Sequence, residues 1–320
     1  MHKTTSDIAI IGAGMAGLSC ATRLGEAGRD VQLFDKGRGA GGRMASRRVE
    51  LGREEVTFDH GAQYFTVRDV EFRAEVIQWQ ALGAIAPWPA AGEDAFIGFP
   101  AMNSPLKEMT VLQEIAWSTR IDSLERDGRE WVLRAAEREH RAAKVAVAIP
   151  AEQAQQLLAK PAPQLAEIAA GATSQPCWSV MVAFAAPLDL AEDTLRASNA
   201  AIAWAARNPA KPGRGEAEAW VLHASPQRSR ELLDLSPEEA GKILLADFFA
   251  QAGLAPVEPV HLAAHRWLYA MADPVAGEHA RYDPDLQLGI AGDYLHSPRV
   301  EGAWISGRAL AEALLDLKAA

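Results

Sequence analysis

The stretch DIAIIGAGMAG, residues 7–17, decides the fold. Residues 7–11 predict a short strand buried on both faces, because the four residues that follow Asp7 are all apolar. Residues 15–28 carry apolar positions at helical spacing and stop at a glycine. Residues 31–34 (VQLF) predict a second buried strand, and Asp35 ends it. Strand, helix and strand together predict a βαβ unit of a parallel sheet.

The loop between this strand and helix predicts a dinucleotide site. Gly12 allows the tight turn, Gly14 lets a pyrophosphate approach the backbone, and Gly17 lets helix and strand pack closely. The helix N-terminus offers free N–H groups and a positive dipole end to the phosphates. Asp35 would accept hydrogen bonds from the ribose hydroxyls of an adenosine. The predicted nucleotide-binding loop comprises Gly12, Ala13, Gly14, Met15, Ala16 and Gly17.

Features at both chain ends favour FAD over NAD. The combination Arg38, Gly41, Gly42, Arg43 after the acid resembles the glutathione-reductase-type FAD family in its amine-oxidase branch. That resemblance implies that the arginine reaches the pyrophosphate or the flavin edge. It also implies that Asp293, after Gly292 at the end of a late strand (286–291), binds the ribityl chain. The N-terminus of the last predicted helix (302–318), opened by Glu301, Gly302 and Ala303, would stabilise negative charge on the reduced flavin.

The remaining elements predict two discontinuous domains and an α/β fold class. We expect a Rossmann-type FAD-binding domain and a second, substrate domain with a mainly antiparallel β-sheet plus helices, and the active site between them. The FAD domain would take residues 1–66, 103–160 and 286–320, and the substrate domain residues 67–102 and 161–285. The other predicted elements are a hairpin before residue 58, helices at 69–82, from Ser104-Pro105 and at 237–252, a hairpin turn at Asp127-Gly128, and strands at 144–150, 178–184 and 219–224.

Composition narrows the class of protein. The chain has 320 residues and a net charge of −10, which argues against nucleic acid because phosphate binding needs clustered Lys and Arg. Its two cysteines, Cys20 and Cys177, are no disulfide framework. No apolar run reaches the length of a membrane span or a signal-peptide core. We therefore expect a cytoplasmic enzyme without a membrane partner.

Four longer segments make the resemblance more specific. FDKGRGAGGRMASRR (34–48), DHGAQYF (59–65), HRWLYA (265–270) and VEGAWISG (300–307) together resemble the bacterial renalases. The likeness covers most of the chain and is densest at 8–66 and 286–315. It implies an FAD-dependent oxidase that converts the 2- and 6-dihydro isomers of NAD(P)H to NAD(P)⁺. Hydride passes to flavin N5, and O₂ reoxidises the flavin to give H₂O₂.

This chemistry needs little from side chains, so no catalytic residue is expected. A dihydropyridine that loses hydride becomes aromatic and has no proton to shed, so no general base is required. The flavin should be non-covalent, because the C-terminal segment has no cysteine. Further FAD contacts are expected from Lys36, Gly42, His60, Gly61, Ala62, Gln63 and Ile121. The expected substrate contacts are Phe96, Ile97, Gly98, Trp204, Asn208, His265, Trp267, Tyr269 and Arg299.

Alternatives remain open at this stage. Amine oxidases of this superfamily carry a tyrosine two residues before the E-G-A of the last helix, where this chain has Arg299. A fixed cation suits a phosphate-bearing substrate better than an ammonium ion. An amine oxidase or desaturase, and a non-enzymatic flavin-binding module, are the other hypotheses.

Three local features have more than one interpretation. Residues 208–216 (NPAKPGRGE) are the most loop-like stretch. Asn208 and Lys211 would belong either to a loop that closes over the dinucleotide or to an ordinary solvent loop. His261 and His265 are four apart but lack the other features of a metal site, so no metal is expected. His60 is expected to order the turn that passes the flavin, and a catalytic acid/base role is the alternative.

Overall fold

An eight-stranded mixed sheet forms the base of the molecule in the computed structural model, which describes residues 4–52 and 54–316. Its order is β17 (Arg281–Asp283), β18 (Leu288–Ile290), β11 (Arg138–Val147), β1 (Thr5–Ile11), β2 (Val31–Phe34) and β8 (Glu114–Ala116). The hairpin of β9 (Ser123–Asp127) and β10 (Glu130–Ala135) pairs antiparallel with the first half of β11. The pairs β1–β2, β1–β11, β11–β18 and β2–β8 are parallel. The predicted βαβ unit is therefore confirmed.

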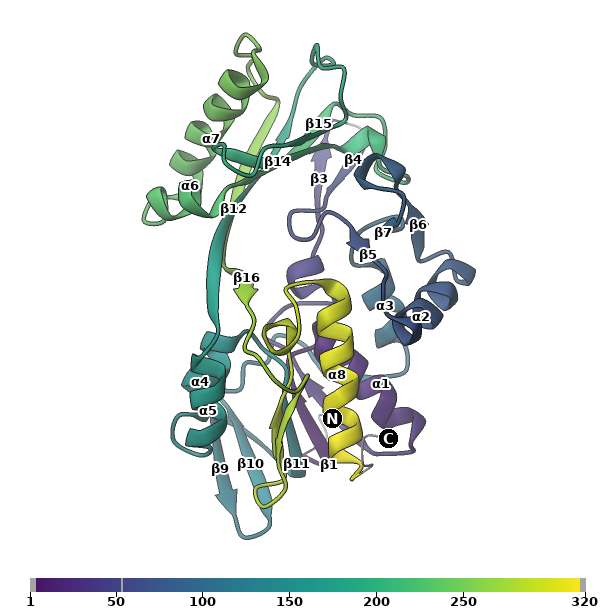
Figure 1. The fold of residues 1–320 in the computed structure, drawn as a ribbon, viewed down its shortest axis with the longest axis vertical. Coiled ribbons are helices and arrows are strands. Elements are labelled where there is room, and N and C mark those ends of the chain that lie inside the picture. The colour runs from purple at the N-terminus through teal and green to yellow at the C-terminus, as the bar shows by residue number, and fades with distance from the viewer. Residues whose placement is uncertain (1–3, 53, 317–320) are drawn as a thin grey trace.

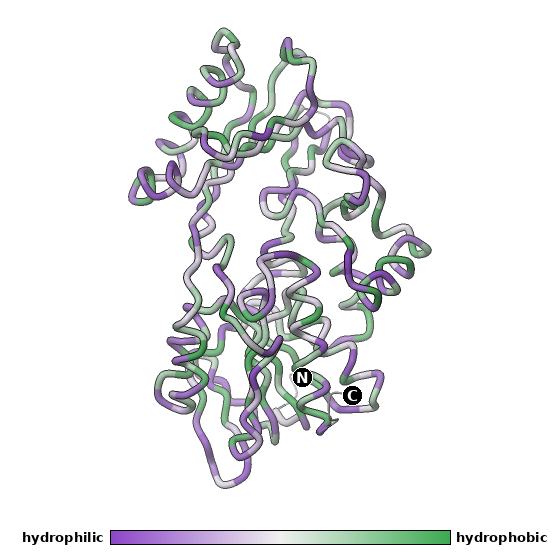
Figure 2. The backbone as a smooth tube through the Cα atoms, in the orientation of Figure 1, coloured by the Kyte–Doolittle hydropathy of each residue, from purple (hydrophilic) through white to green (hydrophobic). Residues whose placement is uncertain are grey.

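Both faces of this sheet are covered, which explains why residues 8–11 are all apolar. Ile8 and Ile10 pack under α1 (Met15–Glu26) and α8 (Val300–Leu314). Ala9 and Ile11 face the other core, formed with α4 (Ala151–Leu158), α5 (Pro163–Ala170) and the β9–β10 hairpin. Figure 1 shows α1 and α8 on one side of the strands and α4 and α5 on the other. Figure 2 shows hydrophobic stretches in the interior strands and hydrophilic ones at the hairpin tip.

A second sheet lies above the first and is antiparallel, as predicted. Its order is β13 (Thr194–Arg196), β14 (Ile202–Arg207), β15 (Ala219–Ala224), β12 (Thr173–Ala183) and β16 (His261–Asp273). One face packs on α7 (Pro237–Ala252) beside α6 (Pro226–Glu231), with Trp178 and Phe248 in the core. The opposite face packs Met181 and Val221 on Phe58 of the hairpin β3 (Arg47–Leu51) and β4 (Glu54–Phe58). The long strands β12 and β16 run from this sheet down to the base (Figure 1).

A third, small sheet completes the fold. It has the order β5 (Phe65–Thr66), β7 (Ala95–Gly98) and β6 (Ile85–Pro87), with α2 (Val70–Ala81) between β5 and β6 in the chain. The helix α3 (Ser104–Thr110) follows β7. Short 3-10 turns are η1 (Gly42–Met44), η2 (Pro89–Ala91), η3 (Asn208–Ala210) and η4 (Asp293–Leu295). None of the helices in the described part of the chain is long and apolar enough to cross a bilayer.

Most predicted elements are present, but several details differ. The strands predicted at 144–150 and 178–184 are Arg138–Val147 and Thr173–Ala183 in the structure. The strands at 31–34 and 219–224 and the helix at 237–252 have the predicted bounds. Ser104 does not cap α3, because Asn103 is the N-cap residue and the Ser104 hydroxyl accepts from Ala101 N at 3.2 Å. The last helix begins at Val300 rather than at Gly302, and its predicted end at Lys318 lies outside the described residues.

Substituting Gly307 tests the close packing of the first and last helices. A Cβ on Gly307 would overlap the carbonyl oxygen of Ala16 and lie 3.0 Å from Ser19 Cβ, so Gly307→Ala must push α8 away from α1. We expect the free energy of unfolding to fall by about 1–3 kcal/mol. Gly25→Ala is the matched control, because nothing lies within 4 Å of its Cβ position. It should stabilise α1 by about 0.5–1 kcal/mol. Thermal denaturation of both variants measures the difference; equal effects would contradict the packing argument.

Candidate active site

The glycine loop after β1 leaves room where a pyrophosphate would lie. A Cβ on Gly12 or Gly17 would overlap backbone oxygen, of Ala148 and Gly12 respectively, and Gly12 has φ +103°. Both glycines therefore serve chain packing. Gly14 differs, because nothing lies within 4 Å of its Cβ position. Gly14 is also the N-cap of α1 and gives no side-chain cap, so the first N–H groups of the helix are available to an anion.

Asp35 holds the turn beside this loop. Its Oδ2 accepts from Ala13 N at 2.7 Å and its Oδ1 accepts from Gly37 N at 2.6 Å. Each carboxylate oxygen keeps a further lone pair, so both ribose hydroxyls of an adenosine could still donate to it. The neighbouring Lys36 instead donates to Gln153 Oε1 at 3.2 Å on the exposed side.

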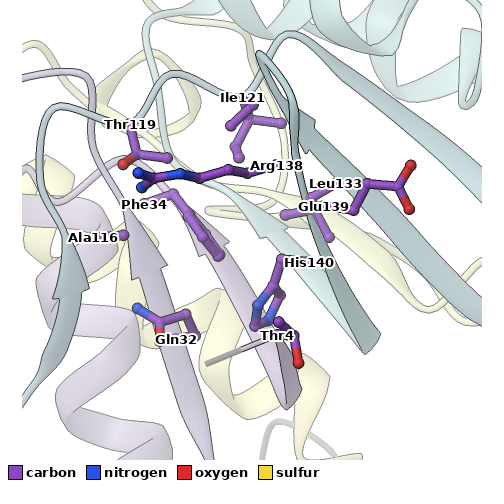
Figure 3. A pocket seen from close by; sticks show the side chains of 11 residues that line it. Thr4, Gln32, Phe34, Ala116, Thr119, Ile121, Leu133, Arg138, Glu139 and His140 are labelled. Atoms are coloured by element: carbon purple, nitrogen blue, oxygen red, sulfur yellow. The ribbon is translucent and has the colours of Figure 1, made fainter. Parts of the chain in front are cut away.

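A cavity of about 220 Å³ opens beside the end of β2 (Figure 3). Its apolar wall includes Phe34, Ala116 and Ile121, and Figure 3 shows Arg138 extended across it toward Thr119. Phe34 directly precedes Asp35 in the chain, so the cavity is adjacent to the predicted ribose site. Ile121, an expected FAD contact, lies in this wall.

Two expected FAD residues from opposite ends of the chain pair with each other. Arg43 Nη2 lies 2.5 Å from Asp293 Oδ1, and Arg43 Nη1 donates to Asp293 Oδ2 at 2.8 Å. Arg43 Nη1 also donates to Ala270 O at 3.3 Å, which ties in the end of β16. Gly292 is required before Asp293, since a Cβ there would overlap the Tyr294 ring. The pair joins the GGR segment to the segment that follows β18.

The start of α8 is anchored through Glu301. Its buried carboxylate accepts from Arg68 N at 2.6 Å and from Asp69 N at 2.8 Å, immediately before α2. Gly302 is required because a Cβ would overlap Ser297 O, and Ala303 N donates to Arg299 O at 3.1 Å. Arg299 is the N-cap residue, but its exposed side chain does not cap the helix. The N-terminal dipole of α8 is therefore left open to a ligand.

A buried carboxylate, Asp59, is the centre of the second half of the site. It accepts from Ser46 Oγ at 2.7 Å, Met102 N at 3.0 Å and Arg214 at 2.7 and 2.9 Å. Lys211 Nζ lies 3.5 Å from the same carboxylate, and all three charged side chains are fully buried. Burial alone would raise the pKa of Asp59, but Lys211 and Arg214 hold it below its ordinary value. Burial lowers the pKa of Lys211 to about 8, against the opposing effect of Asp59.

The two cations of this cluster connect distant segments. Lys211 Nζ donates to Gln63 Oε1 at 2.8 Å and lies 4.9 Å from the centre of the Trp88 ring. Arg214 donates to Gly98 O at 2.8 Å and to Pro100 O at 2.5 Å. The cluster thus fixes residues 58–63, 98–102 and 208–214 against each other. The alternative of an ordinary solvent loop at 208–216 is wrong for the buried residues Asn208, Lys211 and Arg214.

His60, Gly61 and Ala62 lie between this cluster and the strand β16. Trp267 Nε1 donates to His60 O at 2.8 Å, and the two rings stack with centroids 5.3 Å apart. The His265 ring meets His60 edge-on at 5.1 Å. Burial, reinforced by His265, lowers the pKa of His60 to about 4, so the ring is neutral at pH 7. Ala62 N donates to Arg43 O at 2.8 Å, which links this turn to the FAD side.

The other expected substrate residues have different environments. Tyr269 is half-buried and lies between Trp267 and Met271, where the pairing of β16 with β12 is irregular. Asn208 Nδ2 donates to Thr57 O at 2.8 Å. Trp204 lies against Tyr64, with ring centroids 5.6 Å apart.

The three residues of the predicted substrate segment FIG (96–98) are buried or partly buried. Phe96 stacks on Phe65 at 6.0 Å, whereas Ile97 lies fully buried in the hydrophobic core. Gly98 cannot carry a side chain, because a Cβ would overlap the Ala101 and Met102 carbonyl oxygens.

Several residues of the site were missed by sequence reasoning. Asp59 and Arg214 form the buried cluster, and Ser179 and His223 lie on the second sheet beside Trp204 and His265. Asp59 follows the strand EEVTF (54–58), in which Glu54 and Glu55 are exposed, so the sequence around it gave no clear signal of burial. Within residues 4–52 and 54–316, no group of three His, Cys, Asp or Glu could hold a metal ion. His261 stacks on Phe58 at 5.6 Å.

Asp59→Asn tests the buried cluster. The substitution leaves Lys211 and Arg214 without their carboxylate, and breaking such a buried pair costs about 3–5 kcal/mol. Asp127→Asn is the matched control, because Asp127 pairs with Arg141 on the exposed surface at 2.9 Å and should hardly matter. Urea denaturation followed by tryptophan fluorescence gives both values, and similar midpoints for the two variants would refute the role of Asp59.

The difference in unfolding free energy between wild type and Asp59→Asn should depend on pH in a defined direction. Because the folded pKa of Asp59 is lowered, its contribution is complete above the ordinary carboxyl pKa. It is lost as pH falls through the lowered value. The stabilities of wild type and Asp59→Asn should therefore converge toward low pH.

Comparison with known proteins agrees with this geometry. The family model for an NAD(P)-binding Rossmann-like domain matches residues 10–73, and that for flavin containing amine oxidoreductases matches residues 85–315. A 4,4'-diapophytoene desaturase of Staphylococcus aureus (strain Newman) is 40% identical over 63 residues, 20% of this chain and 12% of that protein. The chain thus spans about an eighth of the length of that relative.

Solved structures share the fold at low sequence identity. A protein described as a protoporphyrinogen oxidase from Exiguobacterium sp. 255-15 is 14% identical with a TM-score of 0.76, covering 99% of this chain and 100% of its own. Cyclohexylamine oxidase from Brevibacterium oxydans IH-35A is 14% identical with a TM-score of 0.73, covering 97% and 99%. The family model covers most of the chain. The protein therefore belongs to the flavin-containing amine oxidoreductases, with FAD as its cofactor.

Proposed function

We propose that this enzyme oxidises the 2- and 6-dihydro isomers of NAD(P)H to NAD(P)⁺. The observation that carries the proposal is the net charge of the buried cluster formed by Asp59, Lys211 and Arg214. Asp59 contributes one negative charge and Lys211 and Arg214 contribute two positive ones, so the buried cluster is net positive. A positive centre repels an ammonium substrate and favours a dinucleotide with its anionic phosphates.

The imidazole rings near this cluster are uncharged at neutral pH. Burial lowers the pKa of His60 and of His223 to about 4, and the pKa of His265 is also lowered by burial. None of these rings is cationic at pH 7, and none is paired with a carboxylate that would make it a strong base. Such a site is suited to a neutral ring that loses hydride without losing a proton.

Arg299 supplies the second argument. It lies at the N-terminus of α8 with an exposed side chain, in the position where the amine oxidases carry an aromatic residue. A guanidinium there can pair with a substrate phosphate in bidentate fashion. The N-terminal dipole of α8 has the same sign and adds to this effect.

Different residues are proposed to bind FAD and to orient the substrate. The loop 12–17, Asp35, Arg43 and Asp293 would hold FAD, whose chemistry when bound is hydride acceptance at N5 and transfer of the electrons to O₂. His265, Trp267 and Tyr269 on β16 would orient the dihydropyridine ring and exclude water. The flavin is proposed to be non-covalent, since Cys20 and Cys177 both have thiols whose pKa burial raises.

An amine oxidase is the second candidate. The fold neighbours include cyclohexylamine oxidase and a putrescine oxidase bound to putrescine. The group Tyr64, Trp88 and Trp204 would supply aromatic surface for an amine, with ring centroids 5.6–6.3 Å apart. The Arg196 guanidinium lies 4.5 Å from the Trp204 ring centre. It disfavours an amine substrate, because it already occupies the place over this ring where an ammonium group would bind.

Anaerobic stopped-flow with 6-dihydro-NAD tests the proposed reaction. We expect the long-wavelength flavin absorbance to bleach rapidly and to recover with H₂O₂ formation when air is admitted. Cyclohexylamine is the control substrate and should leave the flavin oxidised. Bleaching by the amine alone would establish the second candidate, and an unreduced flavin with both dihydro isomers and amines would indicate a flavin-binding module.

Arg299→Ala tests the phosphate contact. Loss of a charge-assisted hydrogen bond, worth about 1.5–3 kcal/mol, should slow flavin reduction by the dihydro isomers roughly 10- to 100-fold at low substrate. FAD should stay bound, as measured by the absorbance ratio of the purified protein. Arg48→Ala is the control, because Arg48 is exposed on β3. An unchanged reduction rate in Arg299→Ala would remove this residue from the substrate site.

A further inference from the structure

Four residues form one row across the second sheet, perpendicular to its strands. Trp204 on β14 pairs with His223 on β15, His223 pairs with Ser179 on β12, and Ser179 pairs with His265 on β16. Residues directly opposite each other on neighbouring strands point to the same face, with Cβ atoms about 4.5–5.5 Å apart. The four side chains therefore form a continuous polar row, Trp204–His223–Ser179–His265.

This row lies on the face of the sheet that looks toward the flavin-binding turn. Met181 and Val221 lie two positions from Ser179 and His223 on β12 and β15, and they pack on the β3–β4 hairpin. The opposite face, with Trp178 and Leu222, packs on α7. At one end of the row His265 touches the His60 ring, and at the other end Trp204 touches the Tyr64 ring. The row thus covers residues 60–64, beside the buried Asp59 cluster.

The polar atoms of this row lack partners. Ser179 Oγ, His223 Nε2 and Trp204 Nε1 are all closed to solvent and make no hydrogen bond with any described residue. His60 Nδ1, below the row, is in the same condition. A buried polar atom without a partner costs about 1–3 kcal/mol, so four neighbouring ones are costly unless something else bonds them. The His223 and Trp204 residues are partly exposed, so part of each side chain lies at a surface even though its unpartnered nitrogen is closed to solvent.

The chemistry of the row restricts its ligand. Trp204 Nε1 can only donate, whereas the Ser179 hydroxyl and a neutral imidazole each donate or accept. Burial lowers the pKa of His223 to about 4, and the positive charge of Lys211 acts in the same direction. The row itself contains no charged side chain, and the Lys211 ammonium nearby is already engaged by Gln63 and Asp59. A ligand group that is neutral and carries both donors and acceptors fits best.

We propose that the row Trp204–His223–Ser179–His265 is a specificity subsite for a neutral carboxamide of the substrate. This inference rests on the proposed function, because it deepens the substrate class from a dinucleotide to one with an amide-bearing ring. The carboxamide oxygen accepts from Trp204 Nε1, and its NH₂ group donates to Ser179 Oγ or to His223 Nε2. A carboxylate or an ammonium in its place would lose its hydration among neutral groups.

Calorimetric titration of the FAD-loaded protein with benzamide tests the subsite without any turnover. Benzamide should bind, and benzoate and benzylamine should bind at least ten times more weakly. Ser179→Ala and Trp204→Phe each delete one partner of the amide and should weaken benzamide binding about 3- to 10-fold. The phenylalanine keeps the ring contacts to Tyr64 and Trp88. Thr22→Val is the matched control, since it removes another buried unpartnered hydroxyl, in α1, far along the chain from the row.

The outcomes separate this inference from the proposed function. Benzamide binding that is unchanged in Ser179→Ala and Trp204→Phe, or equal affinity for the charged analogues, would overturn the subsite. Failure of wild type to bind benzamide would overturn it as well. If benzamide binds as expected but neither dihydro isomer reduces the flavin, the subsite stands and the proposed oxidation of dihydropyridines fails.

Discussion

The burial of one carboxylate, Asp59, constrains most of the site. A buried charge is tolerated only when it is paired and fully hydrogen-bonded, and Asp59 meets this with Ser46, Met102, Lys211 and Arg214. Those partners come from segments far apart in the chain. They can satisfy the carboxylate only if the turn 58–63, the end of β7 and the loop after β14 meet in one arrangement. Asp59 therefore joins three connecting segments, normally the mobile parts of a protein, at the candidate site.

A second ion pair plays the same part on the nucleotide side. Arg43 follows the first βαβ unit and Asp293 follows β18, yet the two side chains are joined by two hydrogen bonds of 2.5 and 2.8 Å. Glu301 adds a third link, because its carboxylate holds the backbone before α2. These contacts bring together residues from both ends of the chain that are proposed to hold the cofactor.

The sequence predicted the elements well where local chemistry dominates. Apolar runs, caps and glycines are signals that need only a few neighbouring residues, and they identified β2, β15 and α7 with correct bounds. The stretch 208–216 shows the limit of this reasoning. Its Pro, Gly and charged residues are typical of a solvent loop, but Lys211 and Arg214 are buried because Asp59, about 150 positions earlier in the chain, requires them.

By itself the sequence determined the βαβ unit, the FAD motifs and the order of the elements, since each depends on spacing along the chain. Only the tertiary structure decided which polar side chains meet. The row Trp204–His223–Ser179–His265 has no sequence pattern, because its members come from four strands and are aligned by the register of the sheet. A shift of one residue in any strand would turn its member of the row to the opposite face. The physical reason is that cross-strand contacts depend on register, which the whole packed core sets.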